Sequence, residues 1–156
     1  MKDIINIKWR EKQKKLPGFN CIAYPDGTVT LLNVFEYVNS ETGKTSAIHI
    51  RPICDTTIDS IMKYKKNPWV EVDEWCVITN EDGHFLGGDG AMGNEGFIAK
   101  VDCNDNLIWA MFFTVTNPIK SLQITDDYLI GQNEHNDGSI KINLKQLTDI
   151  KYTKVV

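Results

Sequence analysis

The feature that most constrains this chain is a regular succession of short β-rich runs along its C-terminal half. Runs of β-branched and aromatic residues follow one another between residues 96 and 144, and polar turns separate them. The turns are rich in Asp, Asn and Gly, which readily adopt the backbone angles that tight turns need. Short strands joined by tight turns are typical of an antiparallel up-and-down sheet or of a sandwich. The sequence therefore predicts a mainly β fold of antiparallel meander sheets.

A β-hairpin is expected in the N-terminal third of the chain. Residues 19–24 and 28–38 are rich in β-branched and aromatic residues, and they flank the step Asp26-Gly27. An Asp-Gly step favours the positive backbone angles of a tight hairpin turn. After a polar loop, residues 47–53 predict a third strand of the same meander.

Two further segments show the period-2 alternation of a half-buried strand. Ile5, Ile7 and Trp9 alternate with polar residues, and apolar residues alternate with acidic ones again between residues 69 and 79. Such alternation places the apolar side chains on one face of a strand. We therefore predict one strand over residues 5–9 and another over residues 69–79.

One short helix is predicted near residues 56–66. Ile58, Ile61 and Met62 have the i, i+3, i+4 spacing of a helical face, and the step Asn67-Pro68 ends the pattern. The candidate N-cap residues stand just before this face: Asp55, Thr56 and Thr57.

Part of the β-rich half resembles a blade of a quinoprotein-like β-propeller. The resemblance lies in residues 102–109, which end in Leu-Ile-Trp, and in residues 126–130, which read Asp-Asp-Tyr-Leu-Ile. A closed propeller needs at least four blades of about forty residues, so a chain of 156 residues is too short for one. We expect an open propeller-like stack or a sandwich, in one β-rich domain over residues 1–156.

Composition places the chain among ordinary globular proteins. Apolar residues make up 42% and charged residues 24% of the chain, which excludes a disordered or fibrous class. No continuous apolar run of a signal peptide or membrane span occurs, so we expect a cytoplasmic protein that does not bind membranes. The four cysteines lack the close spacing of zinc ligands, and free thiols are expected. Cys21, Cys76 and Cys103 each lie within or at the end of a strand-like run, and they are expected to pack in a sheet as small hydrophobic residues.

Charge is distributed unevenly along the chain, although the net charge is only −4. Between residues 81 and 139, ten acids face two lysines, a net charge of −8, whereas residues 1–20 carry six bases and two acids, a net charge of +4. Direct nucleic-acid binding is disfavoured because it requires a basic stripe that neutralises phosphates. The acidic segment predicts an electronegative surface instead.

No catalytic or metal-binding constellation is recognisable. His49, His84 and His135 stand far apart and do not neighbour a plausible nucleophile in sequence. The glycine-rich stretch over residues 87–96 could suggest a calcium or phosphate loop. However, it lacks the alternating acids of a calcium loop and the Gly-Lys-Ser/Thr of a phosphate loop. We therefore expect no enzyme, no metal and no cofactor, and glycines that permit a tight path with exposed carboxylates on either side.

Three segments resemble bacterial immunity proteins of contact-dependent growth inhibition systems. These segments are residues 69–75, the glycine-rich stretch into residues 93–97, and residues 107–113 with the following Asn117-Pro118. The resemblance covers residues 69–132. It implies a cytoplasmic protein that binds one cognate toxin domain, often a nuclease, and blocks its active site or substrate surface.

The acidic surface agrees with this implication. Nucleases are basic where they hold phosphates, so an acidic face steers an inhibitor toward them and competes with the nucleic acid. We expect a 1:1 complex with a basic nuclease, with an RNase favoured. The predicted contact residues are acids in turns or loops, with one aromatic anchor: Glu81, Asp82, Asp89, Glu95, Glu134, Asp137 and Trp69.

Two alternatives come from other classes. A small β-rich hydrolase could use the adjacent acids Asp126 and Asp127, but adjacent turn acids usually point apart, whereas glycosidase carboxylates face each other across a substrate. A carbohydrate-binding or scaffold module would display its tryptophans as an exposed aromatic platform. Exposure of the tryptophan side chains discriminates between this module and the inhibitor.

Overall fold

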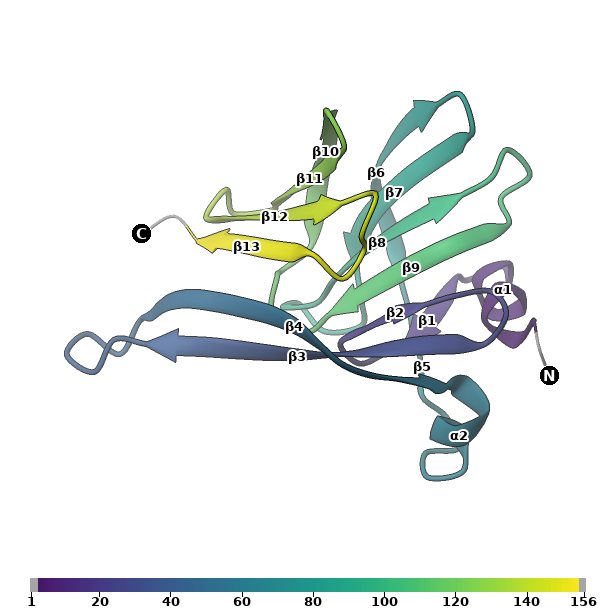
Figure 1. Cartoon of the computed structure of the whole chain (residues 1–156), viewed down its shortest axis with the longest axis horizontal. Helices are drawn as coiled ribbons and strands as arrows, with labels where there is room; N and C mark the ends of the chain where they lie inside the picture. The colour runs from purple at the N-terminus through teal and green to yellow at the C-terminus, as the bar shows by residue number, and fades with distance from the viewer. Residues whose placement is uncertain (1–2, 155–156) are drawn as a thin grey trace.

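The computed structural model describes residues 3–154, and all side chains in that range except those of residues 45 and 46. In this range the protein has two short helices and thirteen strands (Figure 1). The helices are α1 (Ile4–Trp9) and α2 (Ile58–Met62). The strands are β1 (Lys15–Pro17), β2 (Cys21–Ala23), β3 (Thr28–Val38), β4 (Thr45–Thr57), β5 (Trp69–Glu71), β6 (Asp73–Asn80), β7 (Gly83–Asp89), β8 (Gly96–Val101), β9 (Leu107–Phe113), β10 (Ile119–Thr125), β11 (Tyr128–Asn133), β12 (Gly138–Asn143) and β13 (Ile150–Lys154).

Eleven of these strands form one antiparallel sheet, which confirms the prediction of a mainly β, antiparallel fold. Their order is β10-β11-β12-β13-β4-β3-β2-β9-β8-β7-β6, while β1 and β5 pair with each other in a separate ribbon. Strands that follow one another in the chain are mostly neighbours, as expected of a meander. Two pairs of neighbouring strands are not consecutive in the chain: β2 pairs with β9, and β13 pairs with β4. These two pairings join segments far apart in sequence.

The sheet curls until its two end strands, β6 and β10, lie side by side (Figure 1), which gives a nearly closed barrel. At this junction the Sγ of Cys76 lies 3.6 Å from the carbonyl oxygen of Ile119, within hydrogen-bonding range for sulfur. An antiparallel sheet with an odd number of strands has end strands that run the same way, so β6 and β10 are parallel. Strand twist accumulates along a sheet, and sheets of more than about ten strands tend to curl. The arrangement is therefore a single curled sheet rather than a stack of sheets.

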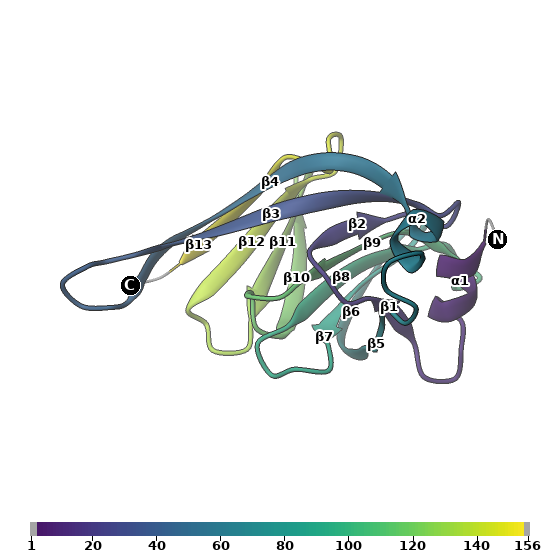
Figure 2. The same ribbon diagram turned by 90° about the horizontal axis from the view of Figure 1, so that it is seen from below.

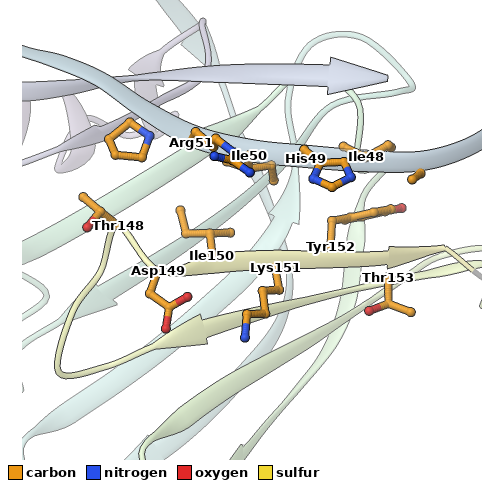
Figure 3. A pocket seen from close by; sticks show the side chains of 12 residues that line it. Ile48, His49, Ile50, Arg51, Thr148, Asp149, Ile150, Lys151, Tyr152 and Thr153 are labelled. Carbon is orange, nitrogen blue, oxygen red and sulfur yellow. The ribbon is translucent and has the colours of Figure 1, made fainter. Parts of the chain in front are cut away.

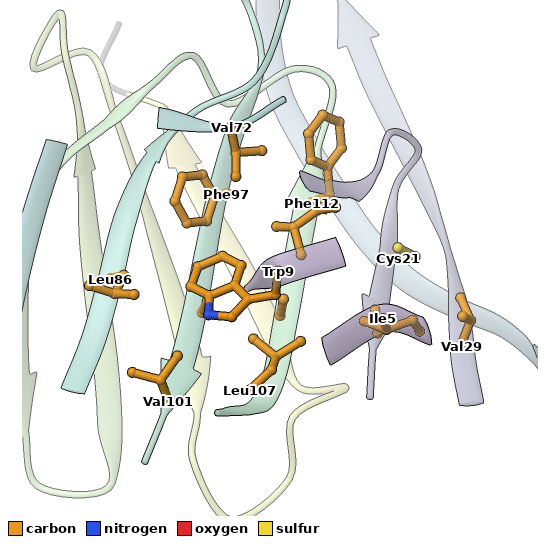
Figure 4. Close-up of a cluster of buried hydrophobic side chains, with 14 of the residues drawn as sticks. Ile5, Trp9, Cys21, Val29, Val72, Leu86, Phe97, Val101, Leu107 and Phe112 are labelled. Carbon is orange, nitrogen blue, oxygen red and sulfur yellow. The ribbon is translucent and has the colours of Figure 1, made fainter. Parts of the chain in front are cut away.

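Both faces of the curled sheet bury apolar side chains. On β8, Ile98 points into the barrel with residues such as Met111 and Ile140, while Phe97 and Ala99 point outward. The outward-pointing side chains form a second cluster, which we call the outer core. It is covered by α1, α2, β1 and β5 (Figures 2 and 4). Strands buried on both faces read as continuous apolar runs, which accounts for the unbroken hydrophobicity of β9.

The prediction of a strand over residues 5–9 is wrong, because this segment forms helix α1. Ile5 and Trp9 are fully buried, and their i, i+4 spacing puts them on one helical face. Trp9 packs edge-on against Phe97 with ring centroids 6.0 Å apart (Figure 4). Ile7, which completes the apparent alternation, is 48% exposed. In so short a run, the spacing of Ile5 and Trp9 fits a helical face as well as a strand face.

The predicted hairpin is confirmed as β2 and β3, although its first strand is shorter than expected. Its turn is closed by a hydrogen bond from the N–H of Tyr24 to the carbonyl of Thr28, with Gly27 at a φ of 94°. Strands β3 and β4 continue past the barrel as a projecting arm (Figures 1 and 2). The Oγ1 of Thr57 caps α2, which ends at Met62 and is therefore shorter than predicted.

Other expectations need correction. The segment predicted as one strand over residues 69–79 divides at Val72 into β5 and β6, because β5 pairs with β1 while β6 joins the main sheet. Cys21 is buried and Cys76 is half-buried, but Cys103 lies exposed in the β8–β9 turn instead of being packed in the sheet. Within residues 3–154, no helix has the length and apolar character needed to cross a membrane.

Candidate protein-interaction surface

Three turns meet at one end of the barrel: β7–β8 (residues 90–95), β9–β10 (residues 114–118) and β11–β12 (residues 134–137). The N–H of Asn117 donates to the carbonyl of Asn94 at 3.0 Å, and the N–H of Glu134 donates to the carbonyl of Pro118 at 2.9 Å. Backbone hydrogen bonds therefore join the three turns into one surface. We call residues 89–95, 114–118 and 133–137 the loop end.

Asn133 organises the loop end from inside. Its side chain is fully buried, and its Nδ2 donates to the carbonyl of Thr116 at 3.2 Å and to Oδ1 of Asp137 at 2.7 Å. Its Oδ1 accepts from the N–H of Asp137 at 3.2 Å. One buried amide thus links two turns and fixes the position of the Asp137 carboxylate. The sequence does not single out this residue, because an Asn at the end of a strand gives no distinctive local signal.

Two glycines, Gly90 in the loop end and Gly96 at its border, permit close approach between segments. A side chain at Gly96 would place its Cβ 2.4 Å from the carbonyl oxygen of Asn117, and one at Gly90 would lie 2.6 Å from Oε1 of Glu95. Both distances are shorter than real Cβ contacts allow. The expectation that glycines provide a tight path here is confirmed, and the reason is contact with a neighbouring turn and with the loop's own carboxylate.

Glu95 has a structural role in this loop. Only 7% of the residue is exposed, and its Oε1 accepts a hydrogen bond from the N–H of Met92 at 2.9 Å. The expectation of exposed carboxylates on either side of the glycines is therefore wrong for Glu95. Its carboxylate closes the β7–β8 turn, because a backbone donor there needs an acceptor.

Asp89 is the last residue of β7 and stands directly opposite Asp73 of β6. Its Oδ1 is shielded from solvent and has no hydrogen-bond partner, although the Trp75 side chain donates a hydrogen bond to the carboxylate. Burial, followed by repulsion from the Asp73 carboxylate, raises the pKa of Asp89, and the Trp75 hydrogen bond opposes this rise. The acid pair concentrates negative charge at the edge of the loop end.

The loop end and the adjoining start of β6 carry carboxylates that lack cationic partners. Among residues 3–154, no Lys or Arg nitrogen forms an ion pair with Asp73, Asp89 or Asp137, and Glu134 meets only Nε2 of His135, at 3.0 Å. The neighbouring Glu74, at the start of β6, is exposed and is likewise without an ion pair. At the opposite end, Lys14 and Lys145 pair with acids of the turns there. The charge of the loop end is thus not neutralised internally.

The structure separates the seven predicted contact residues into three places. Consecutive turns of an antiparallel meander lie at alternate ends, so Glu81 and Asp82 in the β6–β7 turn lie at the end opposite Asp89. Trp69 lies on β5 in the outer layer, where the Nζ of Lys8 is 5.8 Å from its ring. Four residues share the loop end: Asp89, Glu95, Glu134 and Asp137.

The residues considered for chemistry stay apart. Among the described residues, no group of three or more His, Cys, Asp or Glu side chains is arranged to hold a metal ion. His84 of β7 bonds through Nδ1 to Oγ1 of Thr79 at 3.0 Å, while His49 lies on β4 and His135 in the β11–β12 turn. Comparison with known protein families, curated proteins and solved structures finds no match to this chain. The likeness to immunity proteins therefore stays a prediction.

Proposed function

We propose that this chain is an immunity protein that binds a cognate toxin domain, a basic nuclease, and masks its cationic substrate surface with the loop end. The observation that carries the proposal is the set of carboxylates without cationic partners at one end of the barrel, on the β7–β8 and β11–β12 turns and on the adjoining ends of β6 and β7. A surface that holds nucleic acid must be positively charged to neutralise phosphates. A negative surface of matching size competes for those charges.

Rigidity of the loop end supports this function. Binding costs less when the contact groups are already held in position, because less conformational entropy is lost. The buried Asn133 holds the Asp137 carboxylate, and backbone bonds hold Glu134. Complementary charge also accelerates association, which matters for an inhibitor that must act before the toxin does.

The tryptophans give the sugar-binding alternative less support. Trp9 and Trp109 are buried at 0% and 5% exposure and belong to the two cores. Trp75, 45% exposed on β6, stands apart from them on the barrel surface. An aromatic platform requires neighbouring exposed rings, so a single exposed tryptophan favours a protein-binding role over a sugar-binding one.

The test is protection against the toxin domain encoded directly upstream of this gene. Cells that express the toxin domain alone should stop growing, and co-expression of this chain should restore growth. The charge reversals Glu74→Lys and Glu134→Lys, combined in one variant, should weaken protection, because they place positive charge on the loop end, at Glu134, and directly beside it, at Glu74.

Glu81→Lys with Asp82→Lys is the matched control, since it makes the same charge change at the other end of the barrel. Protection should survive in this control. Absence of protection by the unmodified chain would contradict the proposed function. Equal loss of protection in both variants would show that overall charge, and not the loop end, is responsible.

A further inference from the structure

Two neighbouring strands of the sheet, β4 and β13, are hardly paired with each other, and we call the boundary between them the seam. Residues 47–52 of β4 lie beside residues 148–153, which run from the preceding turn into β13, but the two strands share a single ladder pair, Tyr152 with Ile48. By comparison, β12 and β13 share five pairs and β3 and β4 share eleven. Within the described residues, backbone groups of both strands therefore face this seam without a strand partner.

A groove of about 770 Å³ follows the seam (Figure 3). Its floor is apolar, because Ile48, Ile50 and Ile150 point into the barrel and are at least 94% buried. Side chains alternate along β13, so that Ile150 and Tyr152 lie on one side of the strand and Lys151 on the other (Figure 3). The groove thus combines free strand edges with an apolar base.

The exposed lining of the groove is cationic, in contrast to the acidic loop end. Arg51 on β4 and Lys151 on β13 are exposed, and among residues 3–154 neither forms an ion pair with an acid. The one acid in the lining, Asp149, accepts a hydrogen bond from Nδ2 of Asn143 at 3.2 Å. The lining therefore offers positive charge to a ligand.

We propose that this groove binds an extended polypeptide segment of a partner protein in which apolar and acidic residues alternate. Unpaired strand edges bind extended peptides through main-chain hydrogen bonds, and the period-2 geometry of a strand sends alternate side chains to opposite faces. Apolar side chains of the segment contact the isoleucine floor. Acidic side chains of the segment contact Arg51 and Lys151. Charge complementarity selects this segment over a basic one.

The test uses a short fluorescent peptide of alternating Glu and Val, with a peptide of alternating Lys and Val as its control. Fluorescence anisotropy should show binding of the Glu peptide only. Arg51→Glu combined with Lys151→Glu should weaken that binding by at least about tenfold. Lys63→Glu with Lys65→Glu, the same charge change on exposed residues after α2, should leave it unchanged. Far-ultraviolet circular dichroism verifies that both variants fold.

Amide hydrogen exchange provides a readout specific to strand addition. The peptide should slow exchange at residues 49–51 and 149–151, because backbone N–H groups that face the seam gain acceptors. Absence of Glu-peptide binding, or binding that the groove variant does not weaken, would overturn the proposal. Preferential binding of a single-stranded oligonucleotide would also overturn it, since that would make the cationic lining a phosphate site.

Discussion

Replacing Asp89, the last residue of β7, by Asn should stabilise the protein, although most substitutions destabilise. The Oδ1 of Asp89 is shielded from solvent without a hydrogen-bond partner, and the Asp73 carboxylate stands across the strand pair. Asn keeps a polar atom at this position but removes the charge, so it abolishes both the desolvation of the carboxylate and its repulsion by Asp73. Because solvent screens the exposed part of this side chain, we expect a gain of only about 1 kcal/mol.

The pH dependence of this gain follows from the direction of the pKa shift. Burial raises the pKa of Asp89 in the folded protein, so the folded state binds the proton more tightly than the unfolded chain does. This contribution to stability is complete below the unfolded-state pKa and is lost as pH rises through the folded-state pKa. Asn does not titrate. The advantage of Asp89→Asn over the unmodified chain should therefore be larger at neutral pH than at about pH 4.

Thermal unfolding followed by circular dichroism at both pH values measures this effect. A gain of about 1 kcal/mol corresponds to a rise in Tm of about 2–4 °C for a domain of this size. Asp82→Asn, in the exposed β6–β7 turn, is the matched control and should change Tm little. A Tm for Asp89→Asn that is lower than that of the unmodified chain, or a gain equal at both pH values, would refute the reasoning.

Three further predictions concern Asn133 in the loop end, the packing of α1 and the thiols. Asn133→Ala should lower the free energy of unfolding by about 2–3 kcal/mol in urea titrations, because buried groups of two turns lose their hydrogen-bond partner. An unchanged free energy of unfolding would contradict the role of Asn133 in holding the two turns together. Trp9→Ala should cost about 3–5 kcal/mol in the same assay, because it empties a fully buried site; a loss below about 1 kcal/mol would contradict the packing of α1. A thiol reagent should modify the exposed Cys54 and Cys103 rapidly. It should modify the buried Cys21, whose pKa is raised by burial, only when the protein unfolds. Rapid modification of Cys21 in the folded protein would contradict its burial.

Much of the strand inventory could be predicted from the sequence, because it depends on local patterns. The Asp26-Gly27 turn and the strands between residues 96 and 144 follow from turn chemistry and β-rich composition. The curl of the sheet could not be predicted in the same way. It depends on pairings such as Cys21 with Phe112 and Tyr152 with Ile48, which join segments about ninety to one hundred residues apart.

Only part of the candidate site could be predicted from the sequence. Acidic residues in turns were identifiable, and the alternation of meander turns already implies that Glu81 and Asp89 lie at opposite ends. Burial of Glu95 was not identifiable, because it depends on the backbone N–H of Met92 that the folded loop presents. The role of Asn133 depends on a turn seventeen positions earlier in the sequence, which no local pattern reports.

Hydrogen exchange of the complex with the cognate toxin domain would test most directly whether the loop end is the binding surface. Amide exchange is compared peptide by peptide between the free chain and the complex. Slower exchange concentrated at residues 89–95, 114–118 and 133–137 is the predicted result. Protection confined to the opposite end, at residues 81–82 and 102–106, with the loop end unchanged, would contradict the account.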